Sequence, residues 1–184
     1  MRSKRRPGGR LVLVGLPLSL CCAALAFVLA LYAAPRPDLY GKTGFSRVFL
    51  DRRDRVLRIT LAPDGAYRIF TPLTAMPPEL MEATLLYEDR SFYRHPGVNP
   101  LALLRSVAQM ALGGRRMGGS TISMQVVRLT RKFSTASIPG KLRQIWQALV
   151  LERHYGKDEI LEAYLNLAPY GANVEGVGAA ARIW

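Results

Sequence analysis

The chain has 184 residues, a formal net charge of +13 and 49% hydrophobic residues. That hydrophobic fraction excludes a fully disordered or collagen-like chain, and the length fits one modest domain with additional segments. The two cysteines, Cys21 and Cys22, are adjacent, which excludes a disulfide scaffold and a multi-cysteine zinc site, and the two histidines argue against a His-rich metal site. The positive charge indicates an anionic partner, which could be a nucleic acid, a membrane surface or an anionic substrate.

The first 34 residues have the pattern of a membrane anchor. Residues 1–10 carry five Lys and Arg, and residues 11–34 are 24 residues without a charged side chain. At ~1.5 Å per residue, a helix of this length exceeds a hydrocarbon core of ~30 Å. The basic flank predicts a cytoplasmic tail at 1–10 and an extracytoplasmic remainder. A cleaved signal peptide is the alternative, but its apolar region would be ~7–15 residues long, and Pro35 is badly placed for cleavage.

Residues 35–76 are predicted to form a linker and a small β pedestal. The stretch 35–45 is rich in Pro and Gly, as linkers often are. Three strand-like runs follow, at 47–50, 56–61 and 67–70. Turn signals separate them, so we expect a short β-meander. Residues 35–184 together carry 21 Lys and Arg against 13 Asp and Glu, a net charge of +8 that the anchor does not explain.

From residue 77 onward the pattern becomes helical, which predicts a mainly α domain at 77–184. We expect a helix from Pro77, a helix at 100–112, a basic loop at 113–119, a helix capped by Ser120 or Thr121 that runs to Thr130, a loop at 133–140, and two helices over 141–168 with a break near Gly156.

The segment from Glu88 to Gly97 is the first candidate for chemistry. It places two adjacent carboxylates, Glu88 and Asp89, at a helix end and follows them with aromatic residues. Like-charge repulsion and partial desolvation in such a cluster raise the pKa of a carboxyl group, as a general base working near neutral pH requires. An exposed acidic pair beside a packed Phe92 explains the same residues equally well.

The segment from Gly118 to Arg128 is the second candidate. Glycines before a capped helix leave backbone N–H groups free for an anion, and Arg128 adds positive charge. A nucleotide P-loop is excluded because the Gly-Lys-Ser/Thr ending is missing. An ordinary capped amphipathic helix remains the alternative for this segment, and core packing is the simplest explanation of the apolar spacing in the helix from Lys141 to Glu152.

Together these segments resemble the glycosyltransferase family 51 domain, the peptidoglycan glycosyltransferase domain of class A penicillin-binding proteins. The matching segments are EDRSFYRHPG at 88–97, GGSTISMQVVR at 118–128, KLRQIWQALVLE at 141–152, KDEILEAYLNLAPYG at 157–171 and GVGAAARIW at 176–184. The resemblance implies a mainly α, lysozyme-like glycosyltransferase domain at 77–184 that is partly sunk into the membrane, behind one transmembrane helix and a short β-segment.

The resemblance also implies an activity and roles for individual residues. The activity would be polymerisation of lipid II into β-1,4 glycan strands, with inversion and release of undecaprenyl diphosphate. Glu88 would be the catalytic base that removes the proton from the 4-hydroxyl of the acceptor sugar. The remaining site residues would be Asp89, Phe92 and His95 as site-shaping residues, Ser120, Thr121, Gln125, Arg128 and Lys141 as donor or diphosphate-binding residues, and Gln144, Glu152, Tyr164, Asn166 and Gly171 in supporting roles.

A diphosphate leaving group departs as an anion, so it needs positive charge more than a proton. Lys and Arg side chains or a divalent cation, Mg²⁺ or Mn²⁺, can supply that charge, and no organic cofactor is expected. The expected partners are lipid II, the growing glycan strand, the bacterial inner membrane and other cell-wall synthesis proteins. A nucleic acid is not expected, because the anchor would place the basic residues outside the cytoplasm.

Two departures from the family pattern bear on the mechanism and on the extent of the domain. Gln144 stands where the family often has a glutamate, which puts a strict two-glutamate mechanism in doubt. The sequence stops at Trp184, within the fifth matching segment, so we expect a C-terminally truncated domain without a transpeptidase domain. Two other functions stay open: a lysozyme-like lytic enzyme with Glu88 as general acid, and an inactive, truncated, membrane-tethered module.

Overall fold

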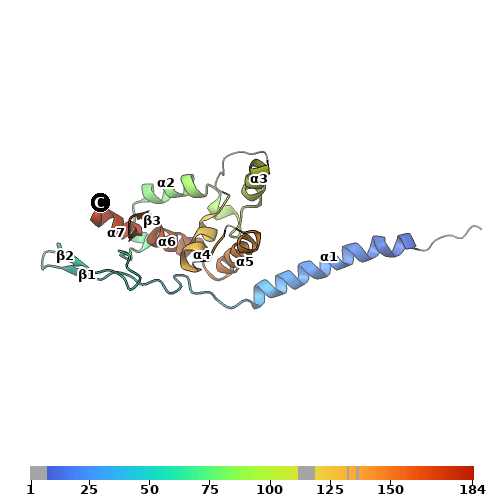
Figure 1. The fold of residues 1–184 in the computed structure, drawn as a ribbon, viewed down its shortest axis with the longest axis horizontal. Helices are drawn as coiled ribbons and strands as arrows, with labels where there is room; N and C mark the ends of the chain where they lie inside the picture. The colour runs from blue at the N-terminus through green and yellow to red at the C-terminus, as the bar shows by residue number, and fades with distance from the viewer. Residues whose placement is uncertain (1–7, 112–118, 132, 136) are drawn as a thin grey trace, which may run out of the picture. The chain divides into compact units, whose positions relative to one another are not determined.

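The computed structural model describes residues 8–111, 119–131, 133–135 and 137–184 (Figure 1). The chain divides into two compact units, residues 1–35 and residues 36–184. The basic loop predicted at 113–119 lies outside the described residues except for Gly119, and so does most of the predicted cytoplasmic tail.

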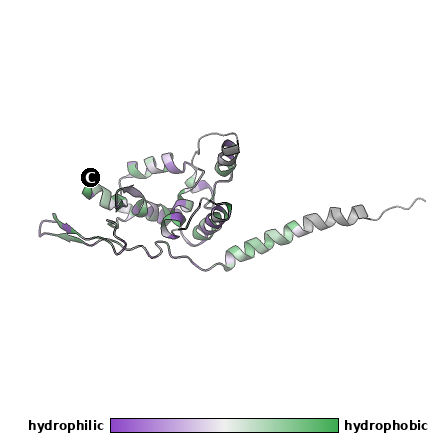
Figure 2. Ribbon diagram, viewed as in Figure 1, coloured by the Kyte–Doolittle hydropathy of each residue, from purple (hydrophilic) through white to green (hydrophobic). Residues whose placement is uncertain are grey.

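The first unit contains one helix, α1 (Gly8–Ala33), of 26 residues. It covers nearly all of the helix predicted at 11–34, and its described side chains, from Ser19 onward, are mainly apolar (Figure 2). Among the described residues, however, no helix meets both the length and the hydropathy that crossing a membrane requires. The predicted helix itself is therefore present in the structure.

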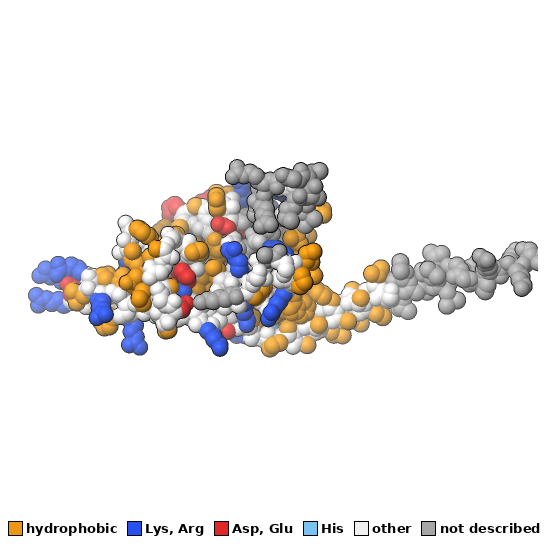
Figure 3. Space-filling view, viewed as in Figure 1, with side chains coloured by type: hydrophobic (Ala, Val, Ile, Leu, Met, Phe, Trp, Pro, Cys, Tyr) orange, Lys and Arg blue, Asp and Glu red, His pale blue; other side chains and the backbone are white. Residues whose placement is uncertain are grey.

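The second unit begins with a β-hairpin whose two strands were both predicted. Strand β1 (Val48–Leu50) pairs antiparallel with β2 (Val56–Ile59). The Asp51 carboxylate closes the turn by accepting hydrogen bonds from the backbone N–H groups of Arg53 at 2.8 Å and Arg55 at 2.9 Å. Exposed basic side chains gather at this end of the domain (Figure 3).

The third predicted strand does not join this hairpin, so the predicted β-meander is wrong in this respect. Its first residue, Tyr67, forms an isolated parallel bridge with Val174. The next residue, Arg68, is almost fully buried and forms ion pairs with Asp64 and Glu175. The physical reason is that a buried guanidinium needs carboxylate partners, and one of these lies near the end of the chain.

The rest of the unit is mainly helical, as predicted. The helices are α2 (Pro78–Glu88), α3 (Pro100–Ala111), α4 (Ile122–Arg131), α5 (Ile138–His154), α6 (Lys157–Leu167) and α7 (Val177–Ile183), with short 3₁₀ turns at Leu73–Ala75 and Phe92–Arg94. A second small hairpin, β3 (Pro169–Gly171) with β4 (Val174–Glu175), was not predicted. Helix α5 begins before the predicted Lys141 because Ser137 caps it by accepting a hydrogen bond from the N–H of Gly140.

Helix α4 lies at the centre of the domain and packs against both α5 and α6 (Figure 1). Its side chains and those of α6 supply most of the fully buried core, including Ile122, Met124, Val126, Ile160, Leu161 and Leu165. A helix that is buried on several sides is held more rigidly than a surface helix, so α4 is a firm base for the polar residues at its N-terminal end.

Helix α6 also fastens the segment that precedes α2. The Asn166 side chain accepts a hydrogen bond from the N–H of Thr71 and donates one to the Thr71 carbonyl, both at 2.8 Å. The Glu162 carboxylate accepts a hydrogen bond from the N–H of Leu73 at 2.7 Å. Gly178 packs directly on the carbonyl of Ile69, where a side chain would clash. These contacts join residues 69–73 to the helical domain across the boundary predicted at residue 77.

We predict that Asn166→Ala destabilises the chain by about 1–3 kcal/mol, because the partly buried N–H and C=O of Thr71 lose the hydrogen bonds to its side chain. The measurement is thermal unfolding of the full chain, where each kcal/mol shifts Tm by ~2–4 °C at this size. Asn173→Ala is the matched control, because Asn173 is exposed and its side chain donates a hydrogen bond to the Gly65 carbonyl at 3.0 Å. Equal losses in the two variants would contradict the fastening role of Asn166.

Candidate active site

A cleft of about 890 Å³ opens beside the C-terminal end of α2. The end of α2, the loop after it, α3, α4 and α5 all contribute to its walls. Its lining residues are Leu86, Tyr87, Glu88, Asp89, Arg90, Ser91, Asn99, Ala102, Arg105, Gly119, Ser120, Thr121, Gln125, Arg128, Thr135 and Gln144. The structure therefore brings the first two candidate segments of the sequence together around one cavity.

Glu88 is the last residue of α2 and is half-buried at the edge of this cleft. One carboxylate oxygen, Oε2, accepts a hydrogen bond from Nε2 of Gln125 on α4 at 2.6 Å. On α6, burial raises the pKa of the Tyr164 phenol, and the charge of Glu88 and a hydrogen bond to it raise that pKa further. Residues of α4 and α6 thus orient the Glu88 carboxylate while it remains at the cleft.

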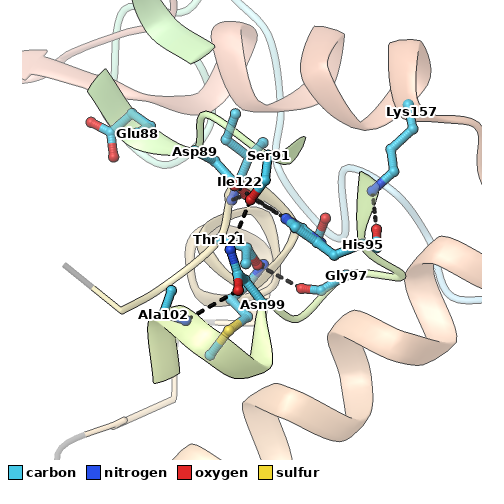
Figure 4. A network of polar contacts seen from close by, with 12 residues as sticks. Glu88, Asp89, Ser91, His95, Gly97, Asn99, Ala102, Thr121, Ile122 and Lys157 are labelled. Carbon is cyan, nitrogen blue, oxygen red and sulfur yellow. Dashed lines mark hydrogen bonds and ion pairs between the residues drawn. The ribbon is translucent and has the colours of Figure 1, made fainter. Parts of the chain in front are cut away.

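Asp89 is adjacent to Glu88 in sequence, but its carboxylate points in a different direction (Figure 4). It is 7% exposed, and its Oδ2 lies 2.9 Å from Nε2 of His95. The same oxygen accepts a hydrogen bond from the N–H of Ile122, the first residue of α4, at 3.2 Å. A negative charge is stabilised at a helix N-terminus. Asp89 therefore ties the loop after α2 to α4 and does not form a carboxylate pair with Glu88.

Lys157, at the start of α6, holds the loop that contains His95. Its ammonium donates hydrogen bonds to the His95 carbonyl at 2.6 Å and to Oε1 of Glu152 at 2.7 Å, and lies 4.4 Å from the ring centroid of the buried Phe92. Glu152 also accepts a hydrogen bond from Ser123. Phe92, His95 and Glu152 were predicted, but Lys157 was not, because its partners at 92 and 95 are about sixty residues away in sequence.

Thr121 caps α4, which confirms one of the two predicted capping residues. Its Oγ1 accepts a hydrogen bond from the N–H of Met124 at 3.2 Å and donates one to the Gly97 carbonyl at 2.6 Å. Gly97 has a φ of +92°, and a Cβ there would lie 2.7 Å from the carbonyl oxygen of Ala148. Both hydrogen bonds of the Thr121 hydroxyl are therefore within the protein, where they position the loop on α4.

Asn99 and Arg105 are cleft residues that the sequence reading missed. Asn99 caps α3, since its Oδ1 accepts a hydrogen bond from the N–H of Ala102 at 3.1 Å, and its Nδ2 donates one to Ser91 at 2.7 Å. The signal for Asn99 was the following Pro100, because Asn before Pro is a typical helix start. Nothing in the sequence indicates which side of α3 faces the cleft, so Arg105 had no comparable signal.

The side of the cleft formed by α4, the residue pair before it and α5 has one positively charged lining residue, Arg128, and neutral polar side chains. Lys141 is not itself a lining residue, but it contacts two of them. The ammonium of Lys141 donates hydrogen bonds to Oγ of Ser120 at 2.8 Å and to Oε1 of Gln144 at 3.0 Å. Burial lowers the pKa of Lys141, and the charge of Arg128 lowers it further. We call Ser120, Gln125, Arg128, Lys141 and Gln144 the cationic wall.

Four of the five predicted supporting residues are absent from the cleft lining: Glu152 and Tyr164, which contact site residues as described above, and Asn166 and Gly171. Asn166 fastens Thr71, as described above. Gly171 is exposed in β3 with a φ of +107°, and an added Cβ would meet nothing within 4 Å. The backbone conformation therefore explains this glycine, and close packing does not.

Comparisons with known proteins agree with the motifs found in the sequence. The family model described as transglycosylase matches residues 52–184. Penicillin-binding protein 1C of Escherichia coli (strain K12) is 46% identical over 118 residues, which are 64% of this chain and 15% of that protein. Penicillin-binding protein 1A/1B of Bacillus subtilis (strain 168) is 32% identical over an alignment of 187 residues, gaps included, that covers 97% of this chain and 20% of that protein.

The chain thus spans about a fifth or less of the length of these curated relatives. The motifs resemble those of the 1C type in particular, and penicillin-binding protein 1C is among the relatives. The family match begins at residue 52, so it includes the second strand of the β1–β2 hairpin as well as the helical domain. Because this match covers well over half of the sequence, it confirms the predicted resemblance, and the chain belongs to the transglycosylase family.

Proposed function

We propose that this chain is a peptidoglycan glycosyltransferase that polymerises lipid II into β-1,4 glycan strands with inversion and release of undecaprenyl diphosphate. The observation that carries the proposal is one cleft that combines an available carboxylate with positively charged side chains. A carboxylate, Glu88, is presented by the end of α2, and the cationic wall is formed by α4 and α5. The names of the relatives, which are penicillin-binding proteins, support a role in cell-wall synthesis.

In the proposed step, Glu88 removes the proton from the 4-hydroxyl of the acceptor sugar. The freed oxygen forms a bond to the anomeric carbon of the donor, and the bond from that carbon to the diphosphate oxygen breaks. The electron pair leaves with the diphosphate, and the configuration inverts because attack comes from the opposite face. The hydrogen bond from Gln125 keeps the Glu88 carboxylate in one orientation, which favours proton transfer along a short path.

The cationic wall suits the leaving group. A diphosphate departs as an anion, so fixed positive charges stabilise the transition state without a general acid. Lys141 is oriented by Ser120 and Gln144, and Arg128 adds a second positive charge close to it. Because these groups are placed before the substrate binds, little reorganisation is needed during the reaction.

The lytic alternative fits the cleft less well. Hydrolysis of a glycosidic bond commonly uses one carboxylic acid and a second carboxylate, both facing the scissile bond. Asp89 is the second carboxylate of the cleft lining, but its Oδ2 atom is already hydrogen-bonded to His95 and to the N–H of Ile122. The geometry therefore favours transfer over hydrolysis.

The same proposal places the chain at the bacterial inner membrane, with residues 1–10 in the cytoplasm and the domain outside it. It rests on the uncharged sequence at 11–34 and on its basic flank. Lipid II and the growing strand would be partners at that membrane, and other cell-wall synthesis proteins remain expected partners.

We predict that Glu88→Gln lowers strand elongation by about 10²-fold or more, because it removes the proposed general base without changing the size of the side chain. The measurement is elongation of labelled lipid II by the full chain in detergent. Glu82→Gln is the control, because Glu82 lies on the same helix, is exposed and is absent from the cleft lining; it should elongate strands normally.

Other outcomes of this experiment would contradict the proposal. Normal elongation by Glu88→Gln would overturn the assignment of the base. Soluble fragments released from finished glycan would favour the lytic enzyme, and a complete absence of elongation and of glycan cleavage would favour the inactive module.

We predict that Gln125→Leu lowers kcat about tenfold with a smaller change in KM, because it removes the hydrogen bond that orients Glu88. The measurement is steady-state elongation at varied lipid II concentration, with thermal unfolding to show that the variant is folded. A rise in KM at unchanged kcat would show that Gln125 only binds substrate.

A further inference from the structure

Gln144 is the most deeply buried member of the cationic wall, with 1% of its surface exposed. Its two polar atoms have different partners on different elements. The amide oxygen accepts a hydrogen bond from Lys141, one turn earlier on α5, at 3.0 Å. The amide nitrogen donates one to the carbonyl of Met124 on α4, at 2.6 Å. Gln144 therefore links Lys141 to the central helix of the domain.

This arrangement requires an amide at position 144. A glutamate could still accept a hydrogen bond from Lys141, but its second oxygen would face the Met124 carbonyl, and two acceptors repel each other. A glutamate would also pair with Lys141 and cancel its charge. The neutral amide orients the ammonium and leaves its full charge for a ligand.

The residues of this wall do not fit a divalent cation. Mg²⁺ and Mn²⁺ prefer carboxylate and other oxygen ligands, and the wall contains no carboxylate. Its two amide oxygens are those of Gln125 and Gln144, and the one on Gln144 already binds the Lys141 ammonium, whose charge would repel a metal ion at the same place.

The rest of the chain does not supply the missing ligands. Within the described parts of the chain, no group of three or more His, Cys, Asp or Glu could hold a metal ion. The residues outside the description contain none of these four types in their sequence. Of the carboxylates that line the cleft, Asp89 is bonded to His95 and to the N–H of Ile122, and Glu88 is bonded to Gln125.

We propose that the cationic wall binds the diphosphate of the donor without a divalent cation, and that Gln144 is the positioning residue that makes this possible. The inference rests on the proposed function and deepens it. Lys141 and Arg128 supply the charge that a metal ion would otherwise supply. Gln144 orients the Lys141 ammonium toward Ser120, just before the N-terminal end of α4.

Direct binding of a short prenyl diphosphate, farnesyl diphosphate, to the full chain tests this proposal without catalysis. Titrations are made with excess EDTA and with excess Mg²⁺. We expect the affinity of the natural chain to differ less than about twofold between the two conditions. Gln144→Glu should bind about tenfold more weakly in EDTA, because its carboxylate neutralises Lys141, and Mg²⁺ should restore most of that loss.

Gln144→Met separates charge from positioning, because methionine has a similar size and neither of the two hydrogen bonds. We expect this variant to bind farnesyl diphosphate more weakly than the natural chain does, and the loss to be about the same in EDTA as in Mg²⁺. If Gln144→Glu does not fold, the natural chain and Gln144→Met still decide the question. A natural chain that binds the diphosphate only with Mg²⁺, or a Gln144→Met variant with unchanged affinity, would overturn the proposal.

Elongation of lipid II by the natural chain in EDTA distinguishes failure of this inference from failure of the proposed function. Elongation in both EDTA and Mg²⁺ supports both. Elongation that stops in EDTA and returns with Mg²⁺ keeps the proposed function and rejects the metal-free wall. No elongation and no diphosphate binding under either condition rejects the two together.

Discussion

The hydrogen bonds between the Asp89 carboxylate and the N-terminus of α4 determine how the site is built. Asp89 is buried, so its charge needs partners, and His95 and the first N–H of α4 supply them. This attachment fixes the end of α2 against the central helix. Glu88 is then held where Gln125, one turn into α4, can reach it. One buried carboxylate thus positions the neighbouring carboxylate that remains at the cleft.

The second organising constraint is the combination of one available carboxylate, Glu88, with positively charged side chains around the cleft. The wall of α4 and α5 has no carboxylate, and Lys141 is partly desolvated beside Arg128, which lowers its pKa. Desolvation of a lysine ammonium costs free energy, and a bound anion offsets that cost. A base and several cations in one cleft suit a reaction that moves negative charge from an acceptor oxygen to a leaving group.

Local signals in the sequence were enough to predict most helices. Thr121 caps α4, the break at Gly156 separates α5 from α6, and α3 starts at Pro100, as the pattern indicates. Partners that are distant in sequence were not predictable. Nothing near Tyr67 indicates Val174 as its partner, and nothing near Lys157 indicates Phe92 or His95. The family motifs, on the other hand, predict both Glu88 and Gln125 as site residues, and in the structure a hydrogen bond joins the two side chains.

The departure at Gln144 shows how a motif and a structure inform one another. Taken from the motif alone, an amide in place of a glutamate puts a strict two-glutamate mechanism in doubt. In the structure the amide donates a hydrogen bond that a carboxylate could not donate, and it leaves Lys141 charged. The amide nitrogen of Gln144 donates to the Met124 carbonyl and its amide oxygen accepts from Lys141, so both polar atoms of the side chain have partners. A neutral side chain at position 144 therefore leaves the positive charge of Lys141 without a carboxylate partner there, and the position of the proposed base, Glu88, does not depend on it.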